Sequence, residues 1–212
     1  MYQPAITGTG VFTPSEVITN DELVASFNAY ADRVNATNAE AIAAGEMEPI
    51  QQSSTEFIIA ASGIENRYVL NKSGVLDPAN MAPVLRERSD EEPGVMAEMA
   101  VDACTKALAQ AGVEAAEVDA VLCAASNHER AYPAIAVEVQ DALGIEGFGF
   151  DMNVACSSAT FAIQQAMATI ATGSADCVLV VNPEICSGHL NFRDRNSHFI
   201  FGDVCTAVIL ER

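Results

Sequence analysis

Short, strongly apolar segments alternate with segments of helical periodicity, and this alternation constrains the fold more than any other feature of the sequence. The apolar segments are residues 5–12, 118–125, 148–154, 177–182 and 205–211. The helical segments are residues 95–111, 133–143 and 157–172, which end at Gly112, Gly144 and Gly173, and the second has Pro133 in its first turn. Nearly continuous apolar strands are typical of a sheet covered on both faces, and glycine commonly ends a helix. The pattern predicts a layered α/β domain with right-handed crossovers.

Residues 26–52 do not fit this alternation. The segment is rich in alanine, asparagine and glutamate, and a helix is expected over 28–44, with a break at Gly45 and Pro49. It could be a lid or a dimer arm. A solvated surface excursion explains the composition equally well.

Length and composition exclude several classes of protein. The chain has 212 residues, half of them hydrophobic, which is enough for one domain with a buried core. No apolar run is long enough to cross a bilayer, and the N-terminus lacks a basic region followed by an apolar stretch, so we expect a cytoplasmic protein without a membrane span. Only 10 Lys and Arg face 29 Asp and Glu, which argues against nucleic acid as a partner. An acidic carrier protein or a phosphate-bearing ligand stays compatible, since a few well-placed arginines suffice.

The six cysteines show neither a zinc pattern nor a disulfide framework. They stand at positions 104, 123, 156, 177, 186 and 205, without a C-x-x-C pair. Cys123, Cys177 and Cys205 lie in apolar strand-like runs, where a free cysteine behaves as a small hydrophobic residue. His189 and His198 lack a ligating spacing, so no metal site is expected and a polar loop is the better interpretation of residues 193–198.

Cys156 differs from the other cysteines in its context. It lies between the predicted strand 148–154 and the predicted helix 157–172, where unpaired backbone N–H groups and the positive end of a helix stabilise a thiolate. Its neighbours Ala155, Ser157 and Ser158 are small and leave room for a substrate. The position favours a nucleophile for covalent acyl transfer. The alternative is a buried small residue like the other cysteines.

Several segments resemble, in the same order, those of β-ketoacyl-[acyl carrier protein] synthase III, a condensing enzyme of the thiolase fold. They are ITGTGVFTPSEVITNDEL, ASGIENRYV with the G-I-x-x-R pattern, SNHERAYPAIAVEVQDALGI, DMNVACSSATFAI around the cysteine and FIFGDVCTAVILER with the F-G-D strand. The resemblance implies a layered α-β-α-β-α fold in the complete enzyme. Residues 1–212 would form its N-terminal α/β half, with an insertion at about 26–52 and the C-terminal half on the same or another chain.

The resemblance also implies a two-step acyltransferase reaction without a cofactor, in fatty acid or related polyketide synthesis. Cys156 would take the acyl group of an acyl-CoA, and malonyl-[acyl carrier protein] would then lose carbon dioxide and attack the acyl-enzyme. An oxyanion hole would include the Cys156 N–H. The histidine and asparagine that assist decarboxylation in this family belong to the second half, and His128, His189 and His198 do not lie in that histidine motif.

Three further residues acquire roles from the resemblance, each beside a structural alternative. Tyr132 would cross the interface of a homodimer to form the floor of the partner's acyl pocket, or would be a core aromatic residue before a helix. Arg195 would contact the adenine region of CoA, or would be a solvated loop residue. Phe57 would stack on that adenine, or would belong to the core.

Departures from the family pattern point to a changed acyl donor. Close relatives carry an arginine near Ala61, which is absent here, and Val204, Cys205 and Thr206 replace the glycine-rich turn after F-G-D. Together with the insertion, these changes favour a donor longer than acetyl. Asn127, His128 and Glu129 follow a predicted strand end, a common place for site residues in α/β sheets.

Other functions stay open at this point. Thiolases, hydroxymethylglutaryl-CoA synthases and chalcone-type synthases share a nucleophilic cysteine at this junction, although the G-I-x-x-R and A-Y-P segments favour synthase III. A non-catalytic partner subunit that shapes a chain-length pocket would not need Cys156. A plain α/β binding domain for CoA thioesters is the third possibility.

Overall fold

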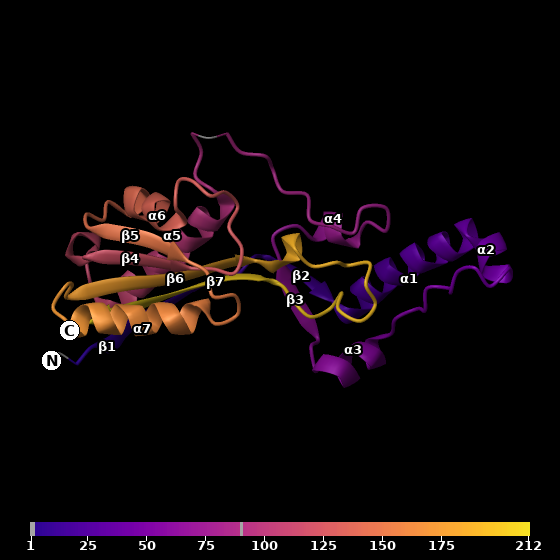
Figure 1. Cartoon of the computed structure of the whole chain (residues 1–212), viewed down its shortest axis with the longest axis horizontal. Helices are drawn as coiled ribbons and strands as arrows, with labels where there is room; N and C mark the ends of the chain where they lie inside the picture. Colours follow the sequence, from indigo (N-terminus) through magenta and orange to yellow (C-terminus); the bar gives the residue numbers. More distant parts are fainter. Residues whose placement is uncertain (1–2, 90) are drawn as a thin grey trace. The chain divides into compact units, whose positions relative to one another are not determined.

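The chain folds into two compact units, each with its own sheet (Figure 1). This computed structural model describes residues 3–89 and 91–212. The five-stranded unit comprises Met1–Thr13, Glu87–Glu184 and Val204–Arg212. The two-stranded unit comprises Pro14–Arg86 and Ile185–Asp203. The chain therefore leaves the first unit and returns to it twice.

The sheet of the five-stranded unit has the strand order β1-β7-β6-β4-β5. Its strands are β1 (Ala5–Phe12), β4 (Ala120–Ala124), β5 (Phe148–Met152), β6 (Cys177–Ile185) and β7 (Asp203–Glu211). Strand β4 pairs in parallel with β5 and with β6, whereas β1 pairs antiparallel with β7. The sheet is therefore mixed, with the buried strand β4 inside it and β5 at the edge of the described sheet.

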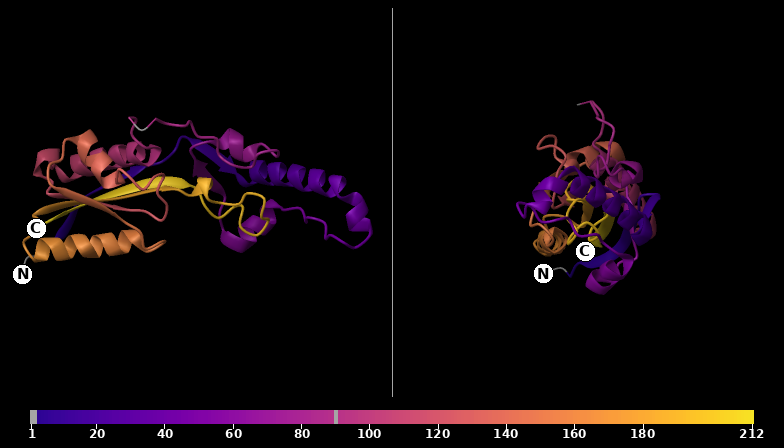
Figure 2. Two further views of the ribbon diagram at one scale, coloured as in Figure 1. Left: turned by 45° about the horizontal axis from the view of Figure 1, so that its top comes forward. Right: turned by 90° about the vertical axis from the view of Figure 1, so that its right-hand side faces the viewer.

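Helices cover both faces of this sheet (Figures 1 and 2). Helices α5 (Val95–Ala111) and α6 (Ile135–Leu143) lie on one face, and α7 (Ser158–Ala171) lies on the other. Alternate residues of β4, Ala120, Leu122 and Ala124, pack against α7, as the two-residue period of a strand requires. Strand β1 lies so close to α5 that a Cβ at Gly8 or Gly10 would collide with the helix backbone.

The two-stranded unit has a hydrophobic core of its own. Strands β2 (Glu16–Thr19) and β3 (Asn66–Val69) form an antiparallel pair with Glu16 opposite Val69. The helices are α1 (Asn20–Thr37), α2 (Ala39–Ala43), α3 (Thr55–Ser62) and α4 (Lys72–Leu76). The largest buried side chains of its core are Phe27, Phe192, Ile18, Leu23 and Ile58. The described residues also form two 3₁₀ turns, η1 (Ala115–Glu117) in the five-stranded unit and η2 (Cys186–Gly188) in the two-stranded unit.

The predicted elements of the five-stranded unit are present, with corrections at their ends. The strand over 5–12 and the helix over 95–111 have the predicted bounds. The helix predicted over 133–143 begins later, at Ile135, and Pro133 lies before its N-cap Ala134, after a cis peptide bond. The Asp151 carboxylate accepts the N–H groups of Ile135 and Ala136 and so fixes this start at 2.8 and 2.9 Å.

The helix predicted over 28–44 has the wrong bounds. Helix α1 begins at Asn20 because Thr19 and Glu22 form a capping box, in which each side chain accepts the backbone N–H of the other. It ends at Thr37, and the short α2 follows. Phe27 and Ala31 of α1 are fully buried, so the first part of the predicted insertion belongs to the core of its unit, while α2 has no buried residue.

Candidate active site

Cys156 lies in a tight turn between β5 and α7. The residue before it, Ala155, has a left-handed backbone with φ of 48°, a conformation that is unfavourable for residues other than glycine. Ser158 stabilises the turn with its hydroxyl, which accepts the N–H of Val154 and donates to the carbonyl of Ala155, both at 2.8 Å. The Asn153 side chain accepts the Ala155 N–H at 3.0 Å and donates to the Ser126 carbonyl at 2.9 Å. The side chains of Asn153 and Ser158 therefore hold the strained Ala155 through its N–H and its carbonyl.

Cys156 is also the accessible thiol of the chain. Of the six cysteines, all in the described part of the chain, Cys156 alone is exposed, and Cys186 is half-buried. Burial raises the pKa of Cys177 and of Cys205 to about 12. Burial also raises the pKa values of the two remaining thiols, Cys104 and Cys123, well above their usual range. A reagent or substrate from solution thus meets Cys156 first.

Tyr132 is an exposed residue of the loop between β4 and α6, three residues before the helix begins. Its side chain is 88% exposed, which excludes the core alternative in the chain as described. The start of the loop is held by Ser126, whose N–H and hydroxyl donate to the two carboxylate oxygens of Glu184 at 2.6 and 2.7 Å. The other end is held where Asp151 caps α6. Tyr132 therefore projects from a loop whose two ends are fixed.

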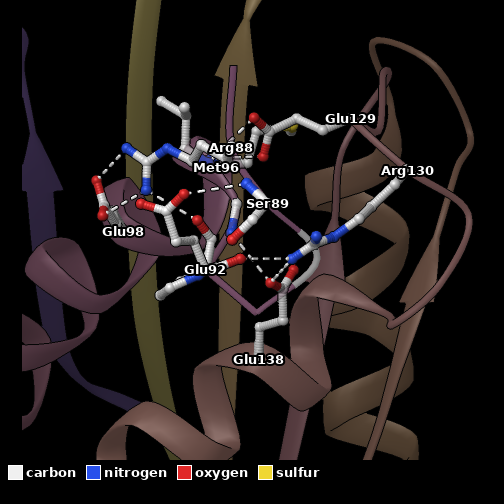
Figure 3. Close-up of polar contacts among 11 residues, drawn as sticks. Arg88, Ser89, Glu92, Met96, Glu98, Glu129, Arg130 and Glu138 are labelled. Atoms are coloured by element: carbon white, nitrogen blue, oxygen red, sulfur yellow. Dashed lines mark hydrogen bonds and ion pairs between the residues drawn. The ribbon is translucent and has the colours of Figure 1, made fainter. Parts of the chain in front are cut away.

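A carboxylate network joins the middle of this loop to the start of α5 (Figure 3). The two oxygens of Glu129 accept the N–H groups of Val95 and Met96 at 3.0 and 2.9 Å, in the first turn of α5. Arg130 forms an ion pair with Glu138 of α6 and donates to the Glu92 carbonyl at 3.1 Å. Negative charge at a helix start is favourable. From the sequence, Glu129 was a possible site residue; in the structure its carboxylate caps the start of α5.

Gly94 shows how tightly this network is packed. Its N–H donates to Glu138 at 3.0 Å. A Cβ at this position would meet the Glu129 carboxylate in its present position, so a larger residue here would displace that side chain. Arg88 donates to both carboxylate oxygens of Glu98 (Figure 3). Arg88 therefore makes its hydrogen bonds to Glu98 of α5 and to the Pro93 carbonyl, and its charge also acts on Glu129.

Phe57 and Arg195 form a stacked pair in the two-stranded unit. The guanidinium carbon of Arg195 lies 3.8 Å from the ring centroid of Phe57. Its Nε donates to the Gln52 carbonyl at 2.7 Å, and the Phe57 ring meets Phe199 edge-on at 5.8 Å between centroids. Arginine stacked on an aromatic face presents a flat, positively charged surface. Ala61, on the same helix as Phe57, is exposed.

The histidines do not form a metal site. No group of three or more His, Cys, Asp or Glu side chains able to hold a metal ion occurs among residues 3–89 and 91–212. His128 Nε2 lies 3.8 Å from Asp151. His198 is fully buried, packs against Phe27 with its ring tilted by 47°, and has its Nε2 3.1 Å from the Ser53 hydroxyl. Burial lowers the pKa of His198 to about 4, so it is a neutral core residue at neutral pH.

The structure distributes the expected site residues over the two units. Cys156 and Tyr132 lie in the five-stranded unit, whereas Phe57 and Arg195 lie in the two-stranded unit, where they contact each other. The roles of the four residues stay predictions. The network around Arg130 was not predicted from the sequence. Its signal was the adjacent and oppositely charged pair of Glu129 and Arg130, together with the glutamates near the start of α5.

Comparison with known proteins relates the chain to one family. The model of the 3-oxoacyl-[acyl-carrier-protein (ACP)] synthase III family matches residues 150–212. A β-ketodecanoyl-[acyl-carrier-protein] synthase of Pseudomonas aeruginosa is 62% identical over 187 residues, which are 88% of this chain and 53% of that protein. A β-ketoacyl-[acyl-carrier-protein] synthase III of Granulibacter bethesdensis is 34% identical over 99% of this chain and 52% of its own length.

Solved structures agree with these relatives. The synthase III of Aquifex aeolicus matches 99% of this chain and 54% of its own chain, with a TM-score of 0.73 and 26% identity. The priming β-ketosynthase of the R1128 polyketide pathway shares the fold with a TM-score of 0.72 at 24% identity. The predicted resemblance and the predicted thiolase-like α/β fold are thus confirmed. The chain spans about half the length of the curated relatives it matches. No helix in the described residues is long and apolar enough to span a membrane.

Proposed function

We propose that this chain, which is related to the 3-oxoacyl-[acyl-carrier-protein] synthase III family, is the N-terminal half of a condensing enzyme that carries its acyl intermediate on Cys156. The observation that carries the proposal is the position of Cys156, the exposed thiol of the chain, on a strained turn between β5 and α7. An accessible thiolate at a helix start is the nucleophile that acyl transfer from a thioester requires. The buried cysteines cannot take this role.

The reaction has two steps. In the first, the Cys156 sulfur attacks the carbonyl of an acyl-CoA, a new carbon–sulfur bond forms, and CoA leaves as its thiol. In the second, malonyl-[acyl carrier protein] loses carbon dioxide, and the electron pair of the broken bond forms a carbon–carbon bond to the acyl carbonyl while the bond to Cys156 breaks. No redox cofactor is needed, because decarboxylation supplies the electron pair. We expect the histidine and asparagine that assist this step in the second half of the fold.

Stabilisation of the tetrahedral intermediate begins in the turn itself. The N–H groups of Ser157 and Ser158 donate to the carbonyls of Val154 and Ala155 at 3.1 and 3.0 Å, so the turn already uses them. We assign the oxyanion to the Cys156 N–H together with a donor from the second half. A preorganised donor of this kind lowers a barrier by about 3 kcal/mol.

The proposed acyl donor has eight carbons. The relative from Pseudomonas aeruginosa is named for a β-ketodecanoyl product, which has ten carbons. Two of these carbons come from the malonyl unit after it has lost carbon dioxide, so the donor of such a product supplies eight. The departures of this chain at Ala61 and in residues 26–52 support a donor other than acetyl.

The remaining assignments concern partners and pockets. Strand β5 lies at the edge of the described sheet, and its Phe148 and Phe150 are 43% and 37% exposed. We propose that this edge pairs with a second copy in a homodimer, in which Tyr132 reaches the acyl pocket of the partner. The exposed Phe161 and Met167 of α7 would be covered by the second half of the fold. Acyl-CoA and acyl carrier protein are cytoplasmic substrates, and we propose the same location for the enzyme.

The stacked pair of Arg195 and Phe57 is the proposed contact for the nucleotide end of CoA. Its positive charge suits phosphate groups, and its flat face suits adenine. The geometry that supports this assignment is the 3.8 Å approach of the two side chains. Arg195→Ala should weaken binding of acyl-CoA and leave acyl-pantetheine, which lacks the nucleotide, unaffected.

Intact-mass measurement tests the central proposal. The purified protein is mixed with acyl-CoA donors of two to ten carbons, and we expect one acyl adduct, largest with octanoyl-CoA. Cys156→Ala should abolish the adduct, while Cys186→Ala, which removes the half-buried thiol, should retain it. An adduct that survives Cys156→Ala, or a folded protein that takes up no acyl group, would refute the role of Cys156 and favour a non-catalytic partner subunit.

A further inference from the structure

The segment that returns from α2 towards α3 is bound to α1 by two asparagines. We call residues 50–53 the return segment (Figure 1). Asn28 accepts the N–H of Ser53 at 2.8 Å and donates to its carbonyl at 3.1 Å. Asn35 accepts the N–H of Ile50 at 2.8 Å and donates to its carbonyl at 2.9 Å. Residues seven apart lie on one face of a helix, so α1 holds the return segment at both ends.

The middle of the return segment in turn holds Arg195. The backbone carbonyl of Gln52 accepts Arg195 Nε at 2.7 Å, and the Gln52 side chain donates to Asp32 of α1 at 2.8 Å. Next along the chain, the Ser53 hydroxyl contacts the buried His198 at 3.1 Å. The position of the Gln52 carbonyl is therefore set by contacts on either side of it. Arg195, fixed by this carbonyl, lies over Phe57.

We propose that Asn28 and Asn35 are positioning residues for acyl-CoA recognition, which act through the return segment on Arg195. The inference rests on the proposed role of Arg195 and Phe57 at the nucleotide end of CoA. An arginine side chain that moves freely loses rotamer freedom when it binds a ligand, whereas one held in its bound geometry has already lost it. Residues 26–52 then serve as a fixed support of the nucleotide site and not as a lid.

Donors with and without the nucleotide provide the test. The Asn28→Ala/Asn35→Ala double variant of the intact enzyme is assayed with octanoyl-CoA and with octanoyl-pantetheine, at saturating malonyl-[acyl carrier protein]. Freeing one rotamer-rich side chain predicts a rise in KM for octanoyl-CoA of about three- to tenfold. We expect kcat for both donors, and KM for octanoyl-pantetheine, to stay at the wild-type values.

Two further variants make the result specific. Asn38→Ala is the matched control, because the amide of Asn38, which follows the end of α1, donates to the Val34 carbonyl of α1 and not to the return segment; its KM should be that of the wild type. Asn35→Asp keeps the acceptor for the Ile50 N–H and loses the donor, so it should raise KM for octanoyl-CoA in the same direction by less. This milder variant decides the question if the double variant does not fold.

The outcomes separate this inference from the proposed function. An equal rise of KM for both donors, or no rise for either, would overturn the positioning role. If Arg195→Ala raises KM for octanoyl-CoA while the asparagine variants do not, the nucleotide site stands and the inference alone fails. If Arg195→Ala leaves KM for octanoyl-CoA unchanged, the proposed nucleotide site is wrong, and the inference falls with it.

Discussion

His198 makes the stability of the two-stranded unit depend on pH in a predictable window. The imidazole is fully buried, contacts the rings of Phe27 and Phe199, and has no hydrogen-bond partner for its Nδ1 among the described residues. Burial lowers the pKa of His198 from 6.5 to about 4; the positive charges of Arg67 and Arg195 add to the shift, and Asp194 opposes it. A proton on Nδ1 would have no acceptor.

The sign and size of the effect follow from this shift. Between pH 6.5 and about pH 4 the unfolded chain binds a proton at His198 and the folded chain does not, so the free energy of unfolding falls as the pH is lowered. The stability contributed by neutral His198 is complete above pH 6.5 and is lost as the pH falls through that window. The loss from this residue is about 2 kcal/mol between pH 7 and pH 5, and about 3 kcal/mol by pH 4.

Urea unfolding of the wild type and of His198→Gln at pH 7 and pH 5 measures the effect. The glutamine amide can still bond to the Ser53 hydroxyl but does not titrate, so contributions from carboxylates cancel in the comparison. We expect the wild type to lose about 2 kcal/mol more than the variant over this interval. Equal losses in the two proteins would refute the reasoning, since they would show that His198 keeps an ordinary pKa in the folded chain.

Three further predictions concern the five-stranded unit. Iodoacetamide should alkylate Cys156 at least about tenfold faster than any buried thiol of the folded chain, because burial disfavours their thiolates; peptide mapping that finds several sites modified at equal rates would contradict this. Ala155→Gly should raise the free energy of unfolding by about 0.5–1 kcal/mol by relieving the left-handed backbone, and a lower melting temperature would contradict it. Arg130→Met should increase hydrogen exchange in residues 126–134 by more than Arg88→Met, whose hydrogen bonds go to Glu98 and to the Pro93 carbonyl; equal exchange in both variants would remove Arg130 from the support of Tyr132.

The five-stranded unit was the part most readily predicted from the sequence. Strands β4 and β6 are apolar at most positions, and α5 and α6 end at glycines, so local pattern and tertiary packing agree. The predicted start of α6 was wrong because the side chain that accepts its first N–H groups belongs to Asp151. This residue is 16 positions away from Ile135 in the sequence and close to it only in the fold. A contact of this range leaves no local signal.

The two-stranded unit was harder to predict for a different reason. Strands β2 and β3 have four residues each and are separated by α1, α2 and α3, so no hairpin signal marks their pairing. The capping box at Thr19 and Glu22, by contrast, was readable and would have placed the start of α1 correctly.

The candidate site was predicted in part. Cys156 was identified from its place between a strand and a helix, which is a local feature of the sequence. The pairing of Arg195 with Phe57 and of Asn28 with Ser53 joins segments 138 and 25 residues apart, so only the folded chain shows it. Charge pattern in the sequence also did not show that Glu129 would cap a helix.

The pairing of β1 with β7 has a consequence for how the chain folds during its synthesis on the ribosome. Ala5 lies opposite Glu211 in this antiparallel pair, so the first strand is made about 200 residues before its hydrogen-bonding neighbour. At roughly 5–20 residues per second, β1 waits about 10–40 s for that neighbour. Strand β7 lies between β1 and the rest of the sheet, so the nascent chain must keep an apolar strand unpaired during this time. Until β7 emerges, we expect the backbone groups of β1 that later bond to β7 to stay open to chaperones that shield exposed strands.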